Sequence, residues 1–404
     1  MAEVSGGPKS PATKPRYYDQ VLALASGIEI GMLKIGLPDG ETVTITGEKP
    51  GPVVRLNVHH PDLFTRIVRS GVLGFSEAYL DGEWSTDDLM GLLDVLYSRI
   101  GNMYEGFPGA GFVRAYERLR FWMQSNSKRQ AKKNISYHYD LGNEFYRLWL
   151  DDTMTYSAAM FETGQESLEA AQMRKYKSMV DEIGAKPGDH VLEIGCGWGG
   201  FAEYAAGERG LKVTGLTISK EQHDYAVARI ARAGLSDMVD IKLQDYRDET
   251  RQYDGIASIE MFEAVGEKYW PVYFGKLRDC LKPGKSATLQ VITMHESRFE
   301  NYRKTIDFIQ KYIFPGGMLP SPSELRRQAQ GAGLKVAHSV EFGEGYSQTL
   351  RRWYDQFNDQ WERIAPMGFD DRFRRMWNFY LASCAASFHT GNSDVTQFTV
   401  TKQA

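Results

Sequence analysis

The chain has 404 residues, of which 42% are hydrophobic and 25% charged, and its formal net charge is −4. This length exceeds what one hydrophobic core usually serves, so we expect a main domain and a smaller one. The nearly balanced charge excludes a general nucleic-acid binder, because no global positive field would attract phosphates. Three scattered cysteines, Cys196, Cys280 and Cys384, lack pair spacing and predict neither disulfides nor a zinc site, which fits a cytoplasmic protein.

The N-terminal part of the chain predicts two segments. Residues 1–16 contain Gly, Pro, Ser and Lys without an apolar core, which indicates a disordered lead-in and not a signal peptide. Residues 17–113 predict a smaller mixed α+β domain, with alternating strands at Thr42–Thr46 and Val53–Val58 followed by helices. No motif in this domain indicates chemistry.

A basic connector follows at residues 114–135. Between Arg114 and Lys133 it has seven Lys and Arg residues, one acid, and the neighbouring aromatics Phe121 and Trp122. One interpretation is a solvated linker helix. The other is a membrane-surface patch, in which basic side chains meet anionic lipid and aromatic rings lie at the headgroup level.

Residues 136–404 predict an α/β, Rossmann-like domain with a mostly parallel seven-stranded sheet. Its apolar, β-rich runs alternate with helical segments, as in a doubly wound sheet. The five runs are His190–Ile194, Lys212–Ser219, Val239–Asp245, Gly255–Met261 and Lys285–Thr293. Two C-terminal runs, Leu334–Phe342 and Gln397–Val400, could complete the sheet. An insertion at 294–333 is rich in Phe, Tyr and Ile and could line an acyl tunnel or pack as core.

A glycine loop joins the first of these strands to a helix. The run VLEIGCGWGG places Gly195, Gly197 and Gly199 at this turn, after Glu193. Glycine lets the backbone approach a ligand, and the helix offers free N–H groups, so a nucleotide-type cofactor is expected. The spacing is G-x-G-x-G, and the second strand ends without the acid that would hold an NAD ribose, so NAD is disfavoured. The acid Glu193 before the loop, the polar end of the second strand at Ser219, and Asp245 and Tyr246 after the third strand are instead typical of the class I S-adenosylmethionine (SAM)-dependent methyltransferase fold.

Four further blocks make the chain resemble one family. SYHYDLGNEFYRLWLDDTMTYSAAMFE (136–162), LTISKEQHDYA (216–226), LQDYRD (243–248) and KYIFPGGMLPS (311–321) are similar, in order and spacing, to blocks of the cyclopropane-fatty-acyl-phospholipid synthases and mycolic-acid methyltransferases. The match covers about residues 130–400, far more than a single motif. It implies SAM-dependent methylation at a cis double bond of a lipid acyl chain.

The resemblance also implies which residues contact the cofactor. By position these are Tyr156, Ser157, Gly195, Gly197, Thr217, Gln222, Asp245, Tyr246 and Arg247, with Asp245 placed to meet the adenine amine. Taken without the resemblance, Tyr156 and Thr217 would be read as ordinary packing and capping residues.

The reaction requires a dry pocket with an anionic group. Methylation of an alkene leaves a carbocation on the chain, which anions and π faces stabilise when water is excluded, and one proton must then leave. The resemblance implies that Glu263 and Tyr346, with a histidine, a cysteine and a backbone group near Ile292, cradle a bicarbonate ion that acts as the base. We interpret the neighbouring Glu260 as structural.

Two positions depart from that pattern. Ala158 stands where the family has the cysteine, and Gln290 where it has the histidine. Glutamine can form hydrogen bonds but cannot relay a proton near neutral pH. The two departures weaken the predicted bicarbonate site, and they disfavour the prompt deprotonation of the new methyl group that closes a cyclopropane ring. We therefore predict a methylene-branched product, formed after a 1,2-hydride shift, and loss of turnover with retained SAM binding in Glu263→Gln.

Three other readings stay open at this point. The chain could be an ordinary cyclopropane synthase, a non-catalytic lipid-binding protein with a decayed site, or, more distantly, an NAD-dependent reductase. As partners we expect a membrane phospholipid with an unsaturated acyl chain, a second copy of the chain in a homodimer, and a downstream reductase. The expected location is the cytoplasm, peripheral at the inner face of the membrane. The sequence has no run of about 18 apolar residues, so we predict no membrane-spanning segment.

Overall fold

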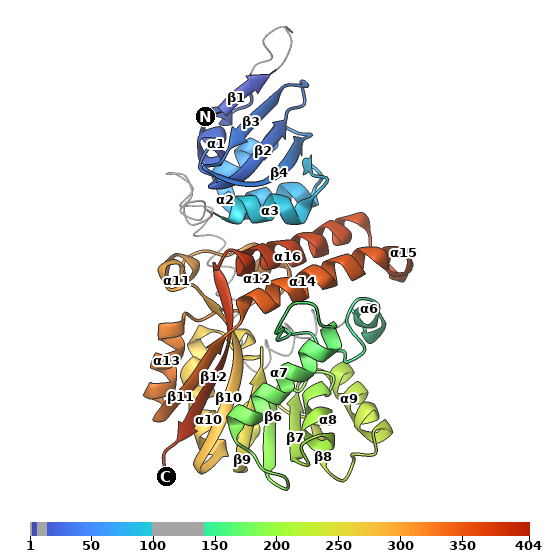
Figure 1. The fold of residues 1–404 in the computed structure, drawn as a ribbon, viewed down its shortest axis with the longest axis vertical. Helices are drawn as coiled ribbons and strands as arrows, with labels where there is room; N and C mark the ends of the chain where they lie inside the picture. Colours follow the sequence, from blue (N-terminus) through green and yellow to red (C-terminus); the bar gives the residue numbers. More distant parts are fainter. Residues whose placement is uncertain (1, 6–13, 99–140) are drawn as a thin grey trace. The chain divides into compact units, whose positions relative to one another are not determined.

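The computed structural model describes residues 2–5, 14–98 and 141–404, and the chain divides into two compact units (Figure 1). The first unit contains the described residues up to 98, together with 297–313 and 368–392. The second contains the described residues from 141 to 296, together with 314–367 and 393–404. Segments of the expected 136–404 domain therefore belong to both units. The basic connector at 114–135 lies outside the described residues.

The first unit is built on a five-stranded sheet with the order β1-β3-β2-β4-β5. Strands β2 and β4 are parallel, and the other pairs are antiparallel. Side chains of β2 and β3 alternate between buried and partly exposed, as expected for a sheet with one covered face. The strands are β1 (Ala2–Ser5), β2 (Ile30–Gly36), β3 (Thr42–Thr46), β4 (Lys49–Val58) and β5 (Trp84–Ser85). The helices are α1 (Tyr18–Ala25), α2 (Asp62–Leu80), α3 (Leu89–Tyr97), α11 (Glu296–Tyr302), α12 (Phe308–Tyr312) and α16 (Asp371–His389).

The second unit contains a seven-stranded sheet with the order β11-β12-β10-β9-β6-β7-β8. Strands β10, β9, β6, β7 and β8 are parallel neighbours, whereas β12 is antiparallel to both β10 and β11. All seven predicted runs form strands of this sheet, which confirms the predicted fold class. The strands are β6 (His190–Ile194), β7 (Lys212–Thr217), β8 (Val239–Leu243), β9 (Tyr253–Ile259), β10 (Leu281–Met294), β11 (Leu334–Glu341) and β12 (Ser393–Lys402).

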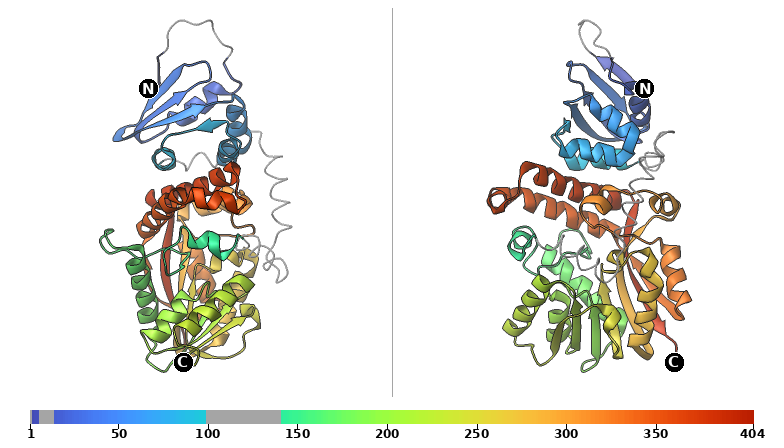
Figure 2. Two further views of the ribbon diagram at one scale, coloured as in Figure 1. Left: turned by 90° about the vertical axis from the view of Figure 1, so that its right-hand side faces the viewer. Right: turned by 180° about the vertical axis from the view of Figure 1, so that it is seen from behind.

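Helices cover both faces of this sheet (Figures 1 and 2). Helices α7, α8 and α9 contact one another in sequence, and α10 contacts α13. The α-helices are α6 (Asn143–Arg147), α7 (Leu168–Ile183), α8 (Gly200–Gly207), α9 (Lys220–Arg232), α10 (Trp270–Cys280), α13 (Pro322–Gly331), α14 (Gly343–Asp359) and α15 (Trp361–Ile364). Single 3-10 turns are η2 (Tyr246–Asp248), η3 (Phe262–Ala264), η4 (Glu267–Tyr269) and η5 (Ala365–Met367).

Two segments differ from or extend the sequence-based expectations. Residues Ala2–Ser5, within the expected disordered lead-in, form β1 on the edge of β3, where the open strand edge satisfies their backbone groups. In the insertion at 294–333, Phe308 contacts Phe379 of α16 with ring centroids 4.9 Å apart, so part of its aromatic content packs as core. The acyl tunnel stays a prediction.

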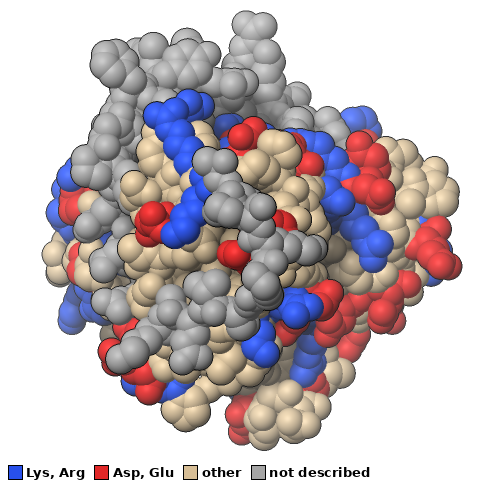
Figure 3. Space-filling view, turned by 90° about the horizontal axis from the view of Figure 1, so that it is seen from above, with Lys and Arg blue, Asp and Glu red and all other residues tan. Residues whose placement is uncertain are grey.

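The surface agrees with the balanced composition. On the face seen in Figure 3, Lys and Arg side chains of the described residues lie among Asp and Glu side chains. No helix in the described part of the chain has the length and apolar character needed to cross a membrane.

Candidate active site

Parallel strands bring the predicted site residues to one edge of the sheet of the second unit. The carboxyl ends of β6, β7, β8, β9 and β10 meet there, which is where open α/β sheets bind ligands. Glu193 lies near the end of β6, Thr217 ends β7, and Glu260 directly follows β9. Asp245 follows β8, and Ile292 lies near the end of β10.

The glycine loop after β6 has the backbone geometry that its residues predict. Gly195, Gly197 and Gly199 all have positive φ angles, of 83°, 51° and 83°. The loop is tied to β7, because the N–H groups of Gly195 and Cys196 both donate to Leu216 O at 2.9 Å. Apart from its two chain neighbours, no atom of the described residues lies within 4 Å of the place where a Cβ on Gly197 would be. A cofactor that approaches the backbone requires such room.

The end of β7 and the start of α9 form a small polar cluster. Thr217 Oγ1 donates to Gln222 Oε1 at 3.0 Å, and Ser219 N–H donates to Thr217 Oγ1 at 3.2 Å. Ser219 caps α9 by accepting from Gln222 N–H. The buried Glu193 carboxyl has an oxygen, Oε2, without a hydrogen-bond partner in the described residues, and burial raises the pKa of Glu193 to about 8. A polar ligand at this edge would satisfy Oε2.

The residues after β8 are held in one orientation. Arg247 donates to both oxygens of Asp245, from Nε at 2.8 Å and from Nη2 at 2.6 Å. Tyr246 lies edge-on to Tyr273, with ring centroids 5.4 Å apart, and burial raises the pKa of its hydroxyl. The structure thus brings Asp245 and Arg247 together as an ion pair.

Two further predicted cofactor residues, Tyr156 and Ser157, contact helices α14 and α7. The ring of Tyr156 contacts Trp353 of α14 at a centroid distance of 5.2 Å. Ser157 Oγ accepts a hydrogen bond from Lys175 Nζ at 2.6 Å, and its carbonyl accepts from Gln172 at 3.0 Å. Both donors belong to α7, so this helix fixes the position of Ser157.

Three of the predicted anion-binding residues converge on Glu260. Ala158 N–H donates to Glu260 Oε1 at 2.7 Å, and Gln290 Nε2 donates to the same oxygen at 2.8 Å. The hydroxyl of Tyr346 donates to Glu260 Oε2 at 2.8 Å. The carboxylate of Glu260 therefore occupies the cradle that the sequence assigned to an anion. Our interpretation of Glu260 as merely structural missed this arrangement, because it depends on the backbone turning at residue 260.

That turn is visible in the backbone angles. Glu260 has φ +48°, in the left-handed region that side-chain-bearing residues seldom adopt. The turn directs the carboxylate toward Gln290 of β10 and Tyr346 of α14 instead of continuing β9. Such strain costs on the order of 1 kcal/mol or more and is concentrated at functional sites.

Glu263 has a different environment. One of its oxygens, Oε1, accepts from Ile292 N–H, which brings together the two residues that the sequence paired. Its other oxygen, Oε2, is buried and has no hydrogen-bond partner in the part of the chain that the structure describes. Burial, and then the charge of Glu260, raise the pKa of Glu263 to about 8. Near neutral pH, Glu263 is therefore mostly a protonated acid. Burial raises the pKa of Glu260 as well, against the charge of Lys175 and the three hydrogen bonds that Glu260 accepts.

Gln290 connects the cradle to the opposite side of β10. Its side-chain oxygen, Oε1, accepts from Gln397 Nε2 at 3.2 Å, and the hydroxyl of Ser178 donates to Gln397 Oε1 at 2.6 Å. This chain fixes the amide orientation of Gln290, so that Nε2 faces Glu260.

The sheet order and the glycine loop define the class of protein: a class I SAM-dependent methyltransferase. A family profile described as mycolic acid cyclopropane synthetase matches residues 126–398. Tuberculostearic acid methyltransferase UfaA1 of Mycobacterium tuberculosis is 40% identical over 382 residues, covering 92% of this chain and 88% of that protein. The cyclopropane-fatty-acyl-phospholipid synthase of Escherichia coli K12 is 34% identical over 368 residues, covering 88% and 89%.

A solved structure agrees with these sequence matches. The crystal structure of mycolic acid cyclopropane synthase CmaA1 complexed with SAH and CTAB superposes with a TM-score of 0.63 at 30% identity, covering 67% of this chain and 98% of that chain. The chain belongs to the mycolic acid cyclopropane synthetase family, and its cofactor is S-adenosylmethionine. Among the described residues, the room beside Gly197 and the oxygen of Glu193 without a hydrogen-bond partner fit such a cofactor.

Proposed function

We propose that the protein methylates the cis double bond of an unsaturated, oleoyl-type acyl chain of a phospholipid and releases a methylene-branched product. The substrate class is supported by relatives named for tuberculostearic acid and for fatty-acyl phospholipids. The observation that carries the proposal is the Glu260 carboxylate, which is held by Ala158, Gln290 and Tyr346 where an external base was expected.

The chemistry assigns one task to each part of the site. When bound, the cofactor supplies an electrophilic methyl group on sulfur. Tyr156, Ser157 and the glycine loop hold the cofactor by this proposal, as do Glu193, Thr217, Ser219, Gln222, Asp245, Tyr246 and Arg247. After methylation, the acyl chain carries a cation on the neighbouring carbon, and the negative charge of Glu260 stabilises it in a site with little water.

The product depends on when a proton leaves the new methyl group. If a base removes it at once, the C–H electron pair closes a cyclopropane ring. If a hydride first moves from the methylated carbon to the neighbouring cationic carbon, the cation moves to the methylated carbon, and loss of a proton from the methyl group then forms an exocyclic C=C bond. In both cases Glu260 accepts the proton in our proposal. Three hydrogen bonds draw electron density from the carboxylate, which slows that transfer and favours the second route.

A tethered base also makes the external anion unnecessary. Three of the donors that would bind bicarbonate, Ala158, Gln290 and Tyr346, already bind Glu260. We therefore expect that turnover does not change between carbonate-free buffer and buffer with added bicarbonate. The variant Glu260→Gly/Ala158→Cys/Gln290→His restores the family's cysteine and histidine and frees the cradle. We expect this triple variant to require bicarbonate and to form some cyclopropane product.

The decisive assay is product analysis. Purified protein is incubated with SAM and liposomes of dioleoyl phospholipid, and the fatty acid methyl esters are examined by mass spectrometry and NMR. Exocyclic methylene protons support the proposal, whereas cyclopropane protons identify an ordinary cyclopropane synthase. SAM binding without any product would favour a non-catalytic lipid-binding protein. The expected homodimer, contact with the inner face of the membrane and downstream reductase remain parts of this proposal.

A further inference from the structure

The glycine loop carries a tryptophan whose side chain bonds to another element. Trp198 lies between Gly197 and Gly199, and only 3% of its surface is exposed. Its indole N–H donates to Asn143 Oδ1 at 2.7 Å. A buried indole needs an acceptor for its N–H, and the amide oxygen of Asn143 supplies it. The glycine loop is thus bonded to α6, which lies 55 residues earlier in the chain.

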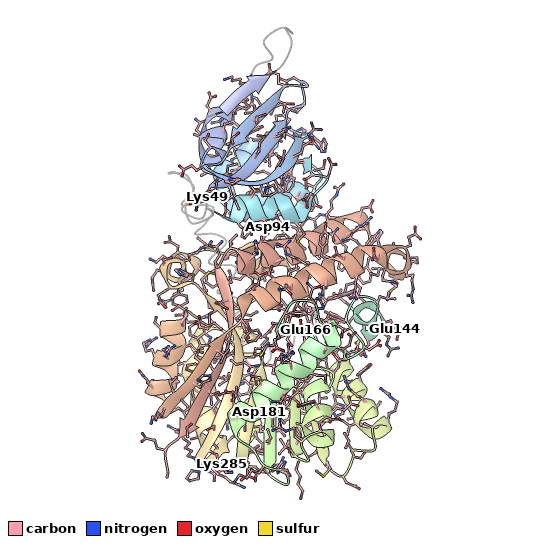
Figure 4. The ribbon with its side chains drawn as sticks, in the orientation of Figure 1. Lys49, Asp94, Glu144, Glu166, Asp181 and Lys285 are labelled. Carbon is pink, nitrogen blue, oxygen red and sulfur yellow. The ribbon has the colours of Figure 1, made fainter. Side chains whose placement is uncertain are left out.

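One face of α6 packs on the glycine loop. The helix begins at Asn143, and Glu144 marks it in Figure 4. Asn143 and Tyr146 are three residues apart, so they lie on the same face of the helix. Tyr146 is fully buried, and its ring contacts the ring of Trp198 with centroids 5.0 Å apart. Glu144, in contrast, is exposed and pairs with Arg147 at 3.2 Å.

Tyr146 also contacts Tyr156, the first of the predicted cofactor residues. The two ring centroids are 5.5 Å apart, and the ring of Trp149 lies 5.6 Å from both of them. Aromatic rings in such contact hold one another in a defined orientation. Tyr146 therefore links two elements that we propose to hold the cofactor, the glycine loop and the ring of Tyr156.

The end of the same segment is attached to α7. Gln172 and Lys175, which interrupt the otherwise largely apolar buried stripe of this helix, both donate to Ser157. The hydroxyl of Tyr176 forms a hydrogen bond with Thr155 Oγ1 at 2.6 Å. The two ends of the segment thus have different supports: α7 holds its end, and the glycine loop holds its beginning at α6.

We propose that Asn143 is a positioning residue for the cofactor, which together with the ring of Tyr146 docks α6 on Trp198 and so keeps the glycine loop and Tyr156 in the arrangement that binds SAM. A loop without this anchor would populate other arrangements, and the apparent affinity falls with the fraction of competent molecules. Saturating SAM restores the competent arrangement. The inference rests on the proposed cofactor contacts of the glycine loop and Tyr156, and it does not depend on the lipid product.

The first test is calorimetric titration of SAM into Asn143→Ala, with Glu144→Gln as the matched control. Asn143→Ala removes the acceptor of the indole N–H, whereas Glu144→Gln changes the neighbouring exposed residue of α6. Loss of one buried hydrogen bond should raise the dissociation constant about tenfold in Asn143→Ala, and the control should bind as the parent does. Asn143→Asp keeps a side-chain oxygen and should restore most of the affinity.

Turnover separates positioning of the cofactor from a loss of stability. In Asn143→Ala the KM for SAM should rise while kcat is kept, because saturating SAM selects the competent loop. A merely structural contact would lower the melting temperature and leave the dissociation constant at room temperature unchanged. An unchanged dissociation constant in Asn143→Ala, or an equal loss in Glu144→Gln, would therefore overturn the proposal.

The second test is a double-mutant cycle of Asn143→Ala and Trp198→Phe. Trp198→Phe keeps an aromatic ring against Tyr146 but removes the indole N–H. If both changes act through one hydrogen bond, the double variant should bind SAM no more weakly than the weaker of the two single variants. Losses that multiply would refute the shared bond. If Asn143→Ala does not fold, Trp198→Phe alone decides, since it too should bind about tenfold more weakly.

Gly197→Ala distinguishes failure of the proposed cofactor site from failure of the positioning role. If Gly197→Ala binds SAM as the parent does, the glycine loop does not hold the cofactor, and the positioning role fails with it. If Gly197→Ala weakens binding and Asn143→Ala does not, the proposed site stands and the role of Asn143 alone is refuted.

Discussion

Replacement of Glu260 by glutamine tests the assignment of the base most directly. The change keeps the size of the side chain and an oxygen that can accept from Ala158 and Gln290, but it removes the negative charge and the ability to take a proton. A positioned general base contributes about 10²- to 10⁴-fold to a rate. Since each tenfold change corresponds to about 1.36 kcal/mol, the barrier should rise by about 3 to 5 kcal/mol. The neighbouring carboxyl of Glu263 is poorly suited to replace it, because Glu263 is mostly protonated near neutral pH.

The assay is single-turnover conversion of SAM with oleoyl phospholipid liposomes, together with calorimetric titration of SAM. We expect Glu260→Gln to bind SAM with nearly the affinity of the parent and to lose at least 100-fold in rate. Glu260→Gly is the second variant, because φ +48° suits glycine and the fold should tolerate the change. A Glu260→Gln protein that retains a third of the parent rate would refute the role of Glu260.

Glu263→Gln serves as the matched comparison. The family resemblance implied that this change abolishes turnover. With its pKa near 8, however, the Glu263 carboxyl at neutral pH already resembles the neutral amide that replaces it. We therefore expect a smaller loss of rate than in Glu260→Gln. A larger loss of rate in Glu263→Gln than in Glu260→Gln would assign the role of the base to Glu263.

Three further changes probe other parts of the site. Tyr346→Phe removes one donor to Glu260 and should lower kcat about tenfold with unchanged SAM affinity, measured in the same assay. Gly195→Ala should lower the melting temperature, because its Cβ would lie 2.7 Å from Met261 Cγ. Gly197→Ala is strained by its φ of +51° but meets no atom of the described residues beyond its chain neighbours, so it should mainly weaken SAM binding. In the folded protein the pKa of Glu193 is about 8, so the free energy of unfolding of the parent should fall as the pH rises from about 4.5 to 8. Glu193→Gln cannot lose this proton and should therefore lose less stability over that range in unfolding scans. Equal slopes for parent and variant would contradict this.

The sequence was sufficient for the sheet and the glycine loop, because strand periodicity and glycine position are local signals. It also paired Glu263 of η3 with Ile292 of β10, because the family resemblance named both residues. It failed at Glu260, whose orientation depends on a left-handed turn that no local pattern encodes. The polar residues Gln172 and Lys175 on the apolar stripe of α7 were a usable signal, but only the fold reveals that they face Ser157.

A base fixed in the chain changes what the site requires. A free ion must be bound from solution, so its occupancy varies with concentration, whereas the Glu260 carboxylate is always present at a high effective concentration. The cost is a strained backbone at residue 260. The fixed carboxylate also cannot leave with its proton, so in our proposal the enzyme must return that proton to solvent in each cycle. The three hydrogen bonds that hold Glu260 also make it a weaker base, and by our proposal slow removal of the methyl proton gives the hydride shift time to occur and favours the branched product.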